Sequence, residues 1–194
     1  MGGRTDAVQS VDAAAVSVVV EDRTESGLWL ARSKVEKWES DEDFIRGLVP
    51  YEVIEDEGNA LMVSGAAYLW QCAMGGGGAG TLLYLNTTNG AIGVGDSATA
   101  ATRTQTDLQA ATNKLRKTAT SVTCPDAVPG VAGTNDLVTV VTSFGSTEAN
   151  WQWNEWALFN SPTAGRMINR RVPGTNLGTK TGGTWQLTIT VQLT

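Results

Sequence analysis

The last residues of the chain show the clearest alternation of hydrophobic and polar positions. From residue 185 to residue 193 every second residue is apolar, and the residues between them are Gln or Thr. This period of two predicts a β-strand with one buried face and one polar face. Apolar runs predict three more strands, at 137–144, 149–159 and 167–172. Together they favour an antiparallel sheet with one side against a core.

Two shorter apolar runs, at 82–85 and 91–94, predict a further pair of strands. The residues between them end in Asn89-Gly90, a dipeptide typical of tight turns. The chain also has 22 glycines, which suits a fold of short strands and tight turns. We therefore predict a mainly β protein: an antiparallel β-sandwich or jelly-roll-like body with one or two helices and an extended N-terminal arm.

Helical periodicity appears in two segments. In 59–74 apolar residues fall on a wide stripe, Gly75 follows as a C-cap, and the acids at 55–57 would suit the N-terminal end of a helix. In 104–117 apolar residues share one face and basic residues occupy the last turn. Residues 41–47 predict one or two helical turns that glycine and proline then stop.

Composition divides the 194 residues into three parts. Residues 1–27 are small, polar and rich in Val and Ala, which predicts an extended arm or an edge strand at 15–20. Residues 28–80 form an acidic N-terminal segment with a helix and a glycine-rich linker, and residues 81–194 form the β-rich body. The run of glycines at 75–80 marks the boundary between the last two parts.

The charge is unevenly distributed along the chain. The formal net charge is -6, and the acids concentrate at 36–57, where they would repel nucleic-acid phosphates and anionic lipid. We therefore expect neither a nucleic acid nor a membrane as partner. A basic stretch contains Arg166, Arg170 and Arg171, with Lys180 further on. The two regions could meet across a subunit contact, although ordinary solvated faces are the favoured interpretation.

The residue types exclude several kinds of chemistry. The chain has no histidine, which rules out Ser-His-Asp and Cys-His catalysis. Its two cysteines, Cys72 and Cys124, make neither a disulfide framework nor a zinc site, and we expect free thiols in a reducing cytoplasm. Residues 93–98 lack the third glycine of a dinucleotide fingerprint and suit a strand-to-helix turn. Asp96, Asp107, Glu148 and Glu155 could converge in space as a carboxylate pair, but the sequence gives no reason to pair any two of them. We therefore predict no catalytic residue, no cofactor and no metal.

Tryptophans are concentrated in the predicted strand 149–159. Trp151 and Trp153 would share one face with Glu155, while Trp156 would point to the other face. Large aromatic residues of this kind anchor a core or a subunit contact. The alternative is an exposed platform for sugar rings, which the neighbouring amides would also suit. We favour the first interpretation.

Glu155 is an acid in an otherwise apolar strand. A buried carboxylate needs a cation or backbone N–H groups beside it. We therefore predict a buried salt bridge or a cap on backbone amides, with Arg170, Arg171 or Lys180 as the partner, in preference to a catalytic role.

Several motifs resemble a structural protein family of tailed bacteriophages. The resemblance covers roughly residues 50–194 and lies in the strings at 50–53, 58–62, 91–100, 105–114, 144–146, 148–151, 153–156, 169–170 and 177–180. The chain departs from the commoner pattern at 75–80, which is unusually rich in glycine, and at 118–131. Both departures fall in expected loops, so they affect the expected partner surface more than the expected fold.

The resemblance implies a non-enzymatic virion protein made in the bacterial cytoplasm of the host. It places the protein on the capsid exterior as a decoration, or cement, protein. The implied partners are the major capsid protein and copies of the chain itself, in a homotrimer. The alternative is a tail-associated structural protein or a receptor-binding or glycan-binding protein.

Overall fold

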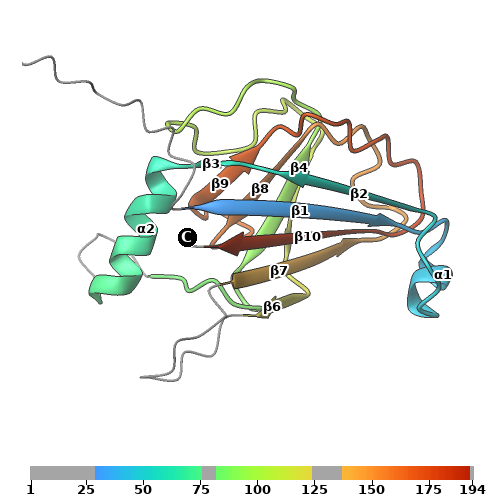
Figure 1. The fold of residues 1–194 in the computed structure, drawn as a ribbon, viewed down its shortest axis with the longest axis horizontal. Helices are drawn as coiled ribbons and strands as arrows, with labels where there is room; N and C mark the ends of the chain where they lie inside the picture. The colour runs from blue at the N-terminus through green and yellow to red at the C-terminus, as the bar shows by residue number, and fades with distance from the viewer. Residues whose placement is uncertain (1–28, 76–81, 124–136, 193–194) are drawn as a thin grey trace, which may run out of the picture.

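The computed structural model describes residues 29–75, 82–123 and 137–192. These residues form two antiparallel five-stranded sheets and two helices, as Figure 1 shows. The predicted fold class, a mainly β sandwich-like body with one or two helices, is confirmed. The predicted arm at 1–27 and Cys124 lie outside the described residues.

The first sheet combines strands from both ends of the chain. Its order is β2-β1-β10-β7-β6, and β10 pairs along its whole length with β1 on one side and β7 on the other. The bounds are β1 Leu30–Lys37, β2 Glu52–Glu57, β6 Ser121–Thr123, β7 Leu137–Phe144 and β10 Trp185–Gln192. The N-terminal segment is therefore part of the same sheet as the C-terminal strand.

The second sheet has the order β3-β9-β8-β4-β5, and β8 lies at its centre between β9 and β4. The bounds are β3 Ala60–Leu61, β4 Ala91–Gly95, β5 Lys114–Thr118, β8 Glu155–Phe159 and β9 Met167–Arg171. Every residue of β4 and β8 is buried. The centre of this sheet therefore has cover on both faces.

The two sheets share one apolar core. Burial in β10 alternates residue by residue, with Leu187, Ile189 and Val191 inside, as the period of two predicted. From the second sheet, Ile92 and Trp156 belong to the same buried cluster. Apolar area buried between the sheets is the main favourable contribution to folding.

Helix α2, Val63–Met74, lies within the predicted segment 59–74 and ends, as predicted, at Gly75, whose φ of 73° is left-handed. It begins later than predicted because β3 occupies the preceding residues and pairs with β9. Gly65 lets the helix approach β9 closely, since a Cβ there would lie 2.1 Å from the carbonyl oxygen of Ile168. The acids at 55–57 belong to β2, so their predicted place at the start of this helix is wrong.

Helix α1, Asp41–Ile45, confirms the short helix expected at 41–47. The hydroxyl of Ser40 caps it by accepting the N–H of Asp43 at 3.1 Å. Gly47 follows with a φ of 68°, which L side chains rarely adopt. The sequence therefore sets both the beginning and the end of this helix.

The helix predicted at 104–117 is wrong. Its last residues form β5, which pairs with β4, and the residues before β5 are irregular. Leu108 is buried, and Glu155 accepts the N–H of Ala110 at 2.7 Å. These tertiary contacts outweigh the local helical period.

Three smaller expectations also differ from the structure. Residues 82–85 form no strand, although two of their leucines pack on the core. The strand expected at 149–159 begins only at Glu155. Gly93 and Gly95 lie inside β4, and no helix follows in 96–113, so the expected strand-to-helix turn at 93–98 is wrong.

Candidate functional site

Glu155 and Arg170 form a buried ion pair between the neighbouring strands β8 and β9. Both side chains are 0% exposed, and Arg170 Nε donates to Glu155 Oε2 at 2.6 Å. The same carboxylate accepts the N–H groups of Gln109 and Ala110 at 3.0 and 2.7 Å. Glu155 thus has both of the roles considered from the sequence, a salt bridge and a cap on backbone amides. Its charge is compensated inside the protein.

This ion pair attaches the irregular loop 96–113 to the sheet. Arg170 Nη1 donates to the side-chain oxygen of Gln105 at 2.9 Å, and Nη2 donates to the carbonyl oxygen of Thr99 at 2.8 Å. Space for the carboxylate exists because residue 95 is glycine, where a Cβ would lie 2.6 Å from Glu155 Oε1. Glu155 and Arg170 therefore act as structural residues that position the loop.

Lys180 is also buried, and it holds a different loop. Its ammonium group donates to the carbonyl oxygen of Gly145 at 2.7 Å and to Asn150 Oδ1 at 2.9 Å. Burial lowers the pKa of Lys180 from its ordinary value. Lys180 therefore fastens the loop 145–150, since both of these bonds go to residues of that loop.

Asp41 joins helix α1 to the same loop. Its carboxylate accepts the N–H and the hydroxyl of Ser146 at 2.8 and 2.6 Å and the hydroxyl of Thr184 at 2.6 Å. The bonds from the side chains of Ser146 and Thr184 hold the pKa of Asp41 below its ordinary value. A carboxyl with a lowered pKa adds stability above its unfolded pKa of about 4, and that stability is lost as the pH falls through the folded pKa.

We expect Asp41→Asn to lower the free energy of unfolding by about 1 kcal/mol at pH 7, because a neutral amide replaces a charged acceptor. The difference from the wild type should shrink as the pH falls through the lowered folded pKa of Asp41, since the carboxyl becomes neutral there. Urea unfolding at a series of pH values from neutral downward measures this. Glu42→Gln, at an exposed neighbour, is the control, and an effect of Asp41→Asn that does not change with pH would contradict the prediction.

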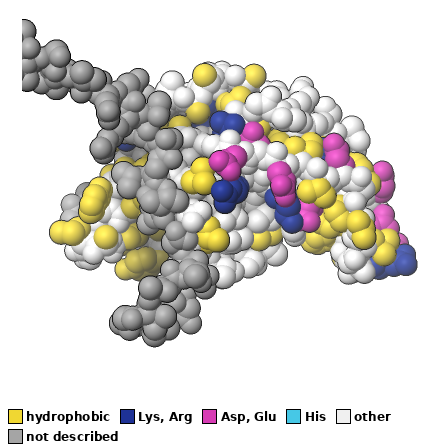
Figure 2. Space-filling model, in the orientation of Figure 1, with side chains coloured by type: hydrophobic (Ala, Val, Ile, Leu, Met, Phe, Trp, Pro, Cys, Tyr) yellow, Lys and Arg dark blue, Asp and Glu magenta, His cyan; other side chains and the backbone are white. Residues whose placement is uncertain are grey.

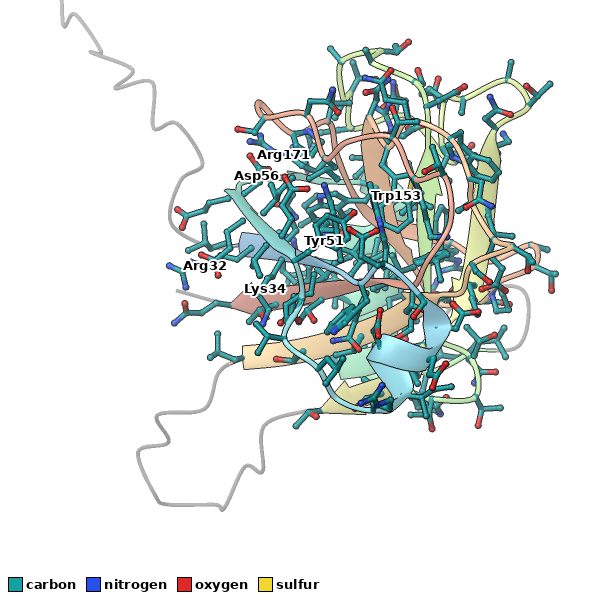
Figure 3. All side chains as sticks on the ribbon, turned by 90° about the vertical axis from the view of Figure 1, so that its right-hand side faces the viewer. Arg32, Lys34, Tyr51, Asp56, Trp153 and Arg171 are labelled. Atoms are coloured by element: carbon teal, nitrogen blue, oxygen red, sulfur yellow. The ribbon has the colours of Figure 1, made fainter. Side chains whose placement is uncertain are left out.

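Arg171 pairs with Asp56 and so joins the two sheets. The guanidinium binds the carboxylate through two bonds, from Nε at 2.7 Å and from Nη2 at 3.1 Å. Figure 3 shows the two side chains next to each other. The acidic and basic regions of the sequence therefore meet at this pair inside one chain.

The tryptophans that the sequence singled out lie in the core. Trp153 and Trp156 are fully buried, and Trp151 is partly buried against the same cluster. Trp153 packs edge to face on Phe144 and on Trp185, with ring centroids 5.0 Å apart in both pairs. A sugar ring cannot stack on Trp153 in this fold. Of the two interpretations, core anchoring describes Trp153 and Trp156.

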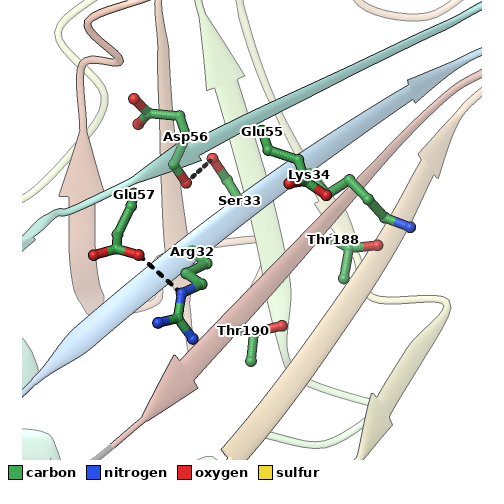
Figure 4. Close-up of a pocket in the computed structure, with 8 residues that line it drawn as sticks. All are labelled: Arg32, Ser33, Lys34, Glu55, Asp56, Glu57, Thr188 and Thr190. Carbon is green, nitrogen blue, oxygen red and sulfur yellow. Dashed lines mark hydrogen bonds and ion pairs between the residues drawn. The ribbon is translucent and has the colours of Figure 1, made fainter.

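One surface depression has a volume of about 510 Å³ and lies over the polar face of β10, as Figure 4 shows. Its walls are charged residues and threonines, and Arg32 donates to Glu57 at 2.9 Å across it. Small-molecule sites are mostly apolar with a few converging polar groups. Because its walls lack apolar side chains and two of its charged residues, Arg32 and Glu57, already bind each other, this depression is a poor ligand site.

Within the described residues, no group of His, Cys, Asp and Glu side chains is arranged to hold a metal ion. None of the helices in this part of the chain is long and apolar enough to cross a bilayer. Comparisons with protein-family models, curated proteins and solved structures found no match.

One exposed apolar surface lies at the α1 end of the molecule, and we call it the tip surface. Val49 is 88% exposed and Ile45 is 80% exposed. The tip surface consists of Ile45, Leu48, Val49, Tyr51 and Val53. The segment is held in place, since the indole N–H of Trp38 donates to the carbonyl oxygen of Leu48 at 2.6 Å. A fixed apolar surface of this kind suits a contact with another protein.

A second exposed apolar surface lies at the opposite end, on α2. It consists of Val63, Ala67, Trp70 and Met74, which we call the α2 outer stripe, and Trp70 and Met74 are 69% and 75% exposed. Figure 2 shows hydrophobic side chains gathered at both ends of the molecule. Charged residues lie between these two ends on the face in view, and several also lie at the α1 end beside the hydrophobic ones.

The sequence interpretation did not identify either surface. For α2 a signal was present, because the helix has no charged residue and is apolar on more than one side. For the tip surface, the run of apolar residues after Gly47 has neither a helical nor a strand period. Whether such residues are buried depends on the tertiary structure, so the sequence alone did not separate them from core residues.

Proposed function

We propose that this protein is a non-enzymatic structural component of a bacteriophage particle, made in the bacterial cytoplasm. Its role is that of a capsid decoration protein, which binds the outside of the icosahedral shell and stabilises it. The partner at the shell is the major capsid protein. The motif resemblance supports this role, and many of its residues, among them Glu155, Arg170 and Lys180, are used for the internal scaffold.

The observation that carries the proposal is the tip surface. It presents apolar side chains on a well-anchored segment, and Glu42, Asp43 and Glu52 flank it in the chain. Such a surface fits an apolar pocket with a basic rim on the partner. Apolar burial contributes about 25 cal/mol per Å². Small contacts of this type, repeated at many symmetry-related positions, add up to a large stabilisation of the shell.

The tail-associated alternative, in the form of a glycan-binding module, depended on an exposed platform made by Trp151 and Trp153. Trp153 is buried, so the structure offers no specific observation in favour of that platform. A tail-associated structural role differs from decoration mainly in the number of copies per particle. The first experiment therefore measures that number.

Quantitative mass spectrometry of purified virions should give a copy number comparable with that of the major capsid protein. A decoration protein covers repeated positions on the shell, so its number follows the shell lattice. A handful of copies per particle would instead indicate a tail-associated protein. Absence from purified particles would overturn the proposal altogether.

A tip variant tests the proposed contact surface. We expect Val49→Glu to weaken binding to shells that lack the protein by about tenfold or more, because it places a charge in an apolar contact. Co-sedimentation of shells with purified protein measures this. Ala111→Glu adds the same charge at an exposed residue outside the tip surface and should bind like the wild type. If Val49→Glu bound shells as tightly as Ala111→Glu does, the tip surface would not be the contact with the shell.

A further inference from the structure

The outward side of α2 has a pattern that the fold of one chain does not use. The helix packs on β9 through Gly65 and buries Tyr68, whereas the α2 outer stripe faces away from this contact. The stripe positions 63, 67, 70 and 74 are separated by four, three and four residues. This is the spacing of a seam that packs on another helix. Val63, the first residue of this seam, is 55% exposed, as expected for a seam that no other part of the chain covers.

Side-chain sizes along the stripe are complementary to those of the same stripe in the reverse direction. From the start to the end they run medium, small, large and large: Val63, Ala67, Trp70 and Met74. In an antiparallel pair of identical helices centred between positions 67 and 70, Trp70 of one copy lies over Ala67 of the other. Met74 then lies over Val63. Each large side chain thus meets a smaller one, and the match is repeated by the two-fold axis.

We infer that a second copy of this chain binds the α2 outer stripe, and that the two α2 helices pack antiparallel about a two-fold axis. A parallel pair would place Trp70 on Trp70 and leave a gap where Ala67 meets Ala67. An antiparallel pair also aligns the two helix dipoles favourably. Because α2 carries no charged residue, close approach of two copies brings no like charges together.

The contact is small. A helix of 12 residues is about 18 Å long, so α2 alone buries less area than a standard stable interface. The dimer is therefore a weak one in dilute solution, and neighbouring copies on a common support would strengthen it.

This inference concerns the free protein and does not rest on the proposed function. The homotrimer expected from the sequence would need a different surface, since the α2 pair closes after two copies. If the tip variant bound shells like the wild type, that result would not contradict the proposed dimer. Likewise, a monomeric protein could still bind a shell through the tip surface.

Sedimentation velocity over a concentration series tests the dimer in the full-length protein. We expect the mass to rise from that of one 20.4 kDa chain to twice that value. Trp70→Lys should keep the protein monomeric throughout, with Met74→Lys as a second variant. Val49→Lys, at an exposed residue of the tip surface, should dimerise like the wild type. A monomeric wild type, a trimer or a dimeric Trp70→Lys protein would overturn the inference.

The antiparallel register has its own test. Ala67→Glu and Trp70→Lys should each be monomeric alone, yet form a heterodimer when mixed in equal amounts. In the antiparallel pair the introduced carboxylate at position 67 of one variant faces the introduced ammonium group at position 70 of the other, while the second contact keeps Trp70 over Ala67. A parallel pair would bring no opposite charges together. Failure of the mixture to dimerise, with both variants folded by circular dichroism, would exclude the antiparallel arrangement.

Discussion

Arg170→Met is expected to lower the free energy of unfolding by about 3–5 kcal/mol, because it leaves the buried carboxylate of Glu155 without its cation. The substitution also removes the bonds that Arg170 donates to Gln105 and to the carbonyl oxygen of Thr99. Two-state urea unfolding, followed by tryptophan fluorescence, measures the change. The loop 96–113 should become more accessible to proteolysis in the same variant, since its attachment to the sheet is lost.

The matched control is Arg171→Met, at the next residue of the same chain. Arg171 is partly exposed and its partner is Asp56, so the loss should be about 1 kcal/mol. The double variant Glu155→Gln/Arg170→Met should recover part of the stability, because it no longer buries an unpaired charge. Equal losses for Arg170→Met and Arg171→Met would mean that the burial of the first pair has no energetic consequence.

The strands with a regular period could be predicted because one face of each lies on the core. β10 follows its predicted alternation, and β7 has the bounds 137–144 that its apolar run indicated. Helix α2 could be recognised by its stripe and by Gly75, whose left-handed φ ends it. In these elements the local pattern and the tertiary contacts agree.

The segment 104–117 could not be predicted in this way, because its conformation is set from outside. The carboxylate of Glu155 accepts two N–H groups of this segment. The last residues of the segment belong to β5, which pairs with β4. A helical period in the sequence therefore coincided with contacts that a helix could not make. The partner of Glu155 was predictable as a basic residue, but only the strand register selects Arg170 among three candidates.

Trp153→Ala is expected to be as damaging as the loss of Arg170, with a decrease of about 3–5 kcal/mol in the free energy of unfolding. The indole is fully buried, packs edge to face on Phe144 and Trp185, and donates its N–H to the carbonyl oxygen of Ala149 at 3.0 Å. Truncation leaves a large cavity between the sheets and removes one of the two bonds to the carbonyl oxygen of Ala149, which still accepts the N–H of Trp151 at 2.9 Å. For a chain of this length the melting temperature should fall by roughly 10 °C.

Trp151→Ala separates a core role from a surface role. Trp151 is only partly buried, so its truncation should cost about 1–2 kcal/mol, well below the cost at Trp153. If the two tryptophans formed an exposed platform, both substitutions would leave stability nearly unchanged, because exposed aromatic side chains contribute little to folding. Differential scanning calorimetry of the two variants therefore distinguishes the interpretations: a large loss at Trp153 alone makes this residue a core anchor that holds β7, β10 and the loop 145–150 together.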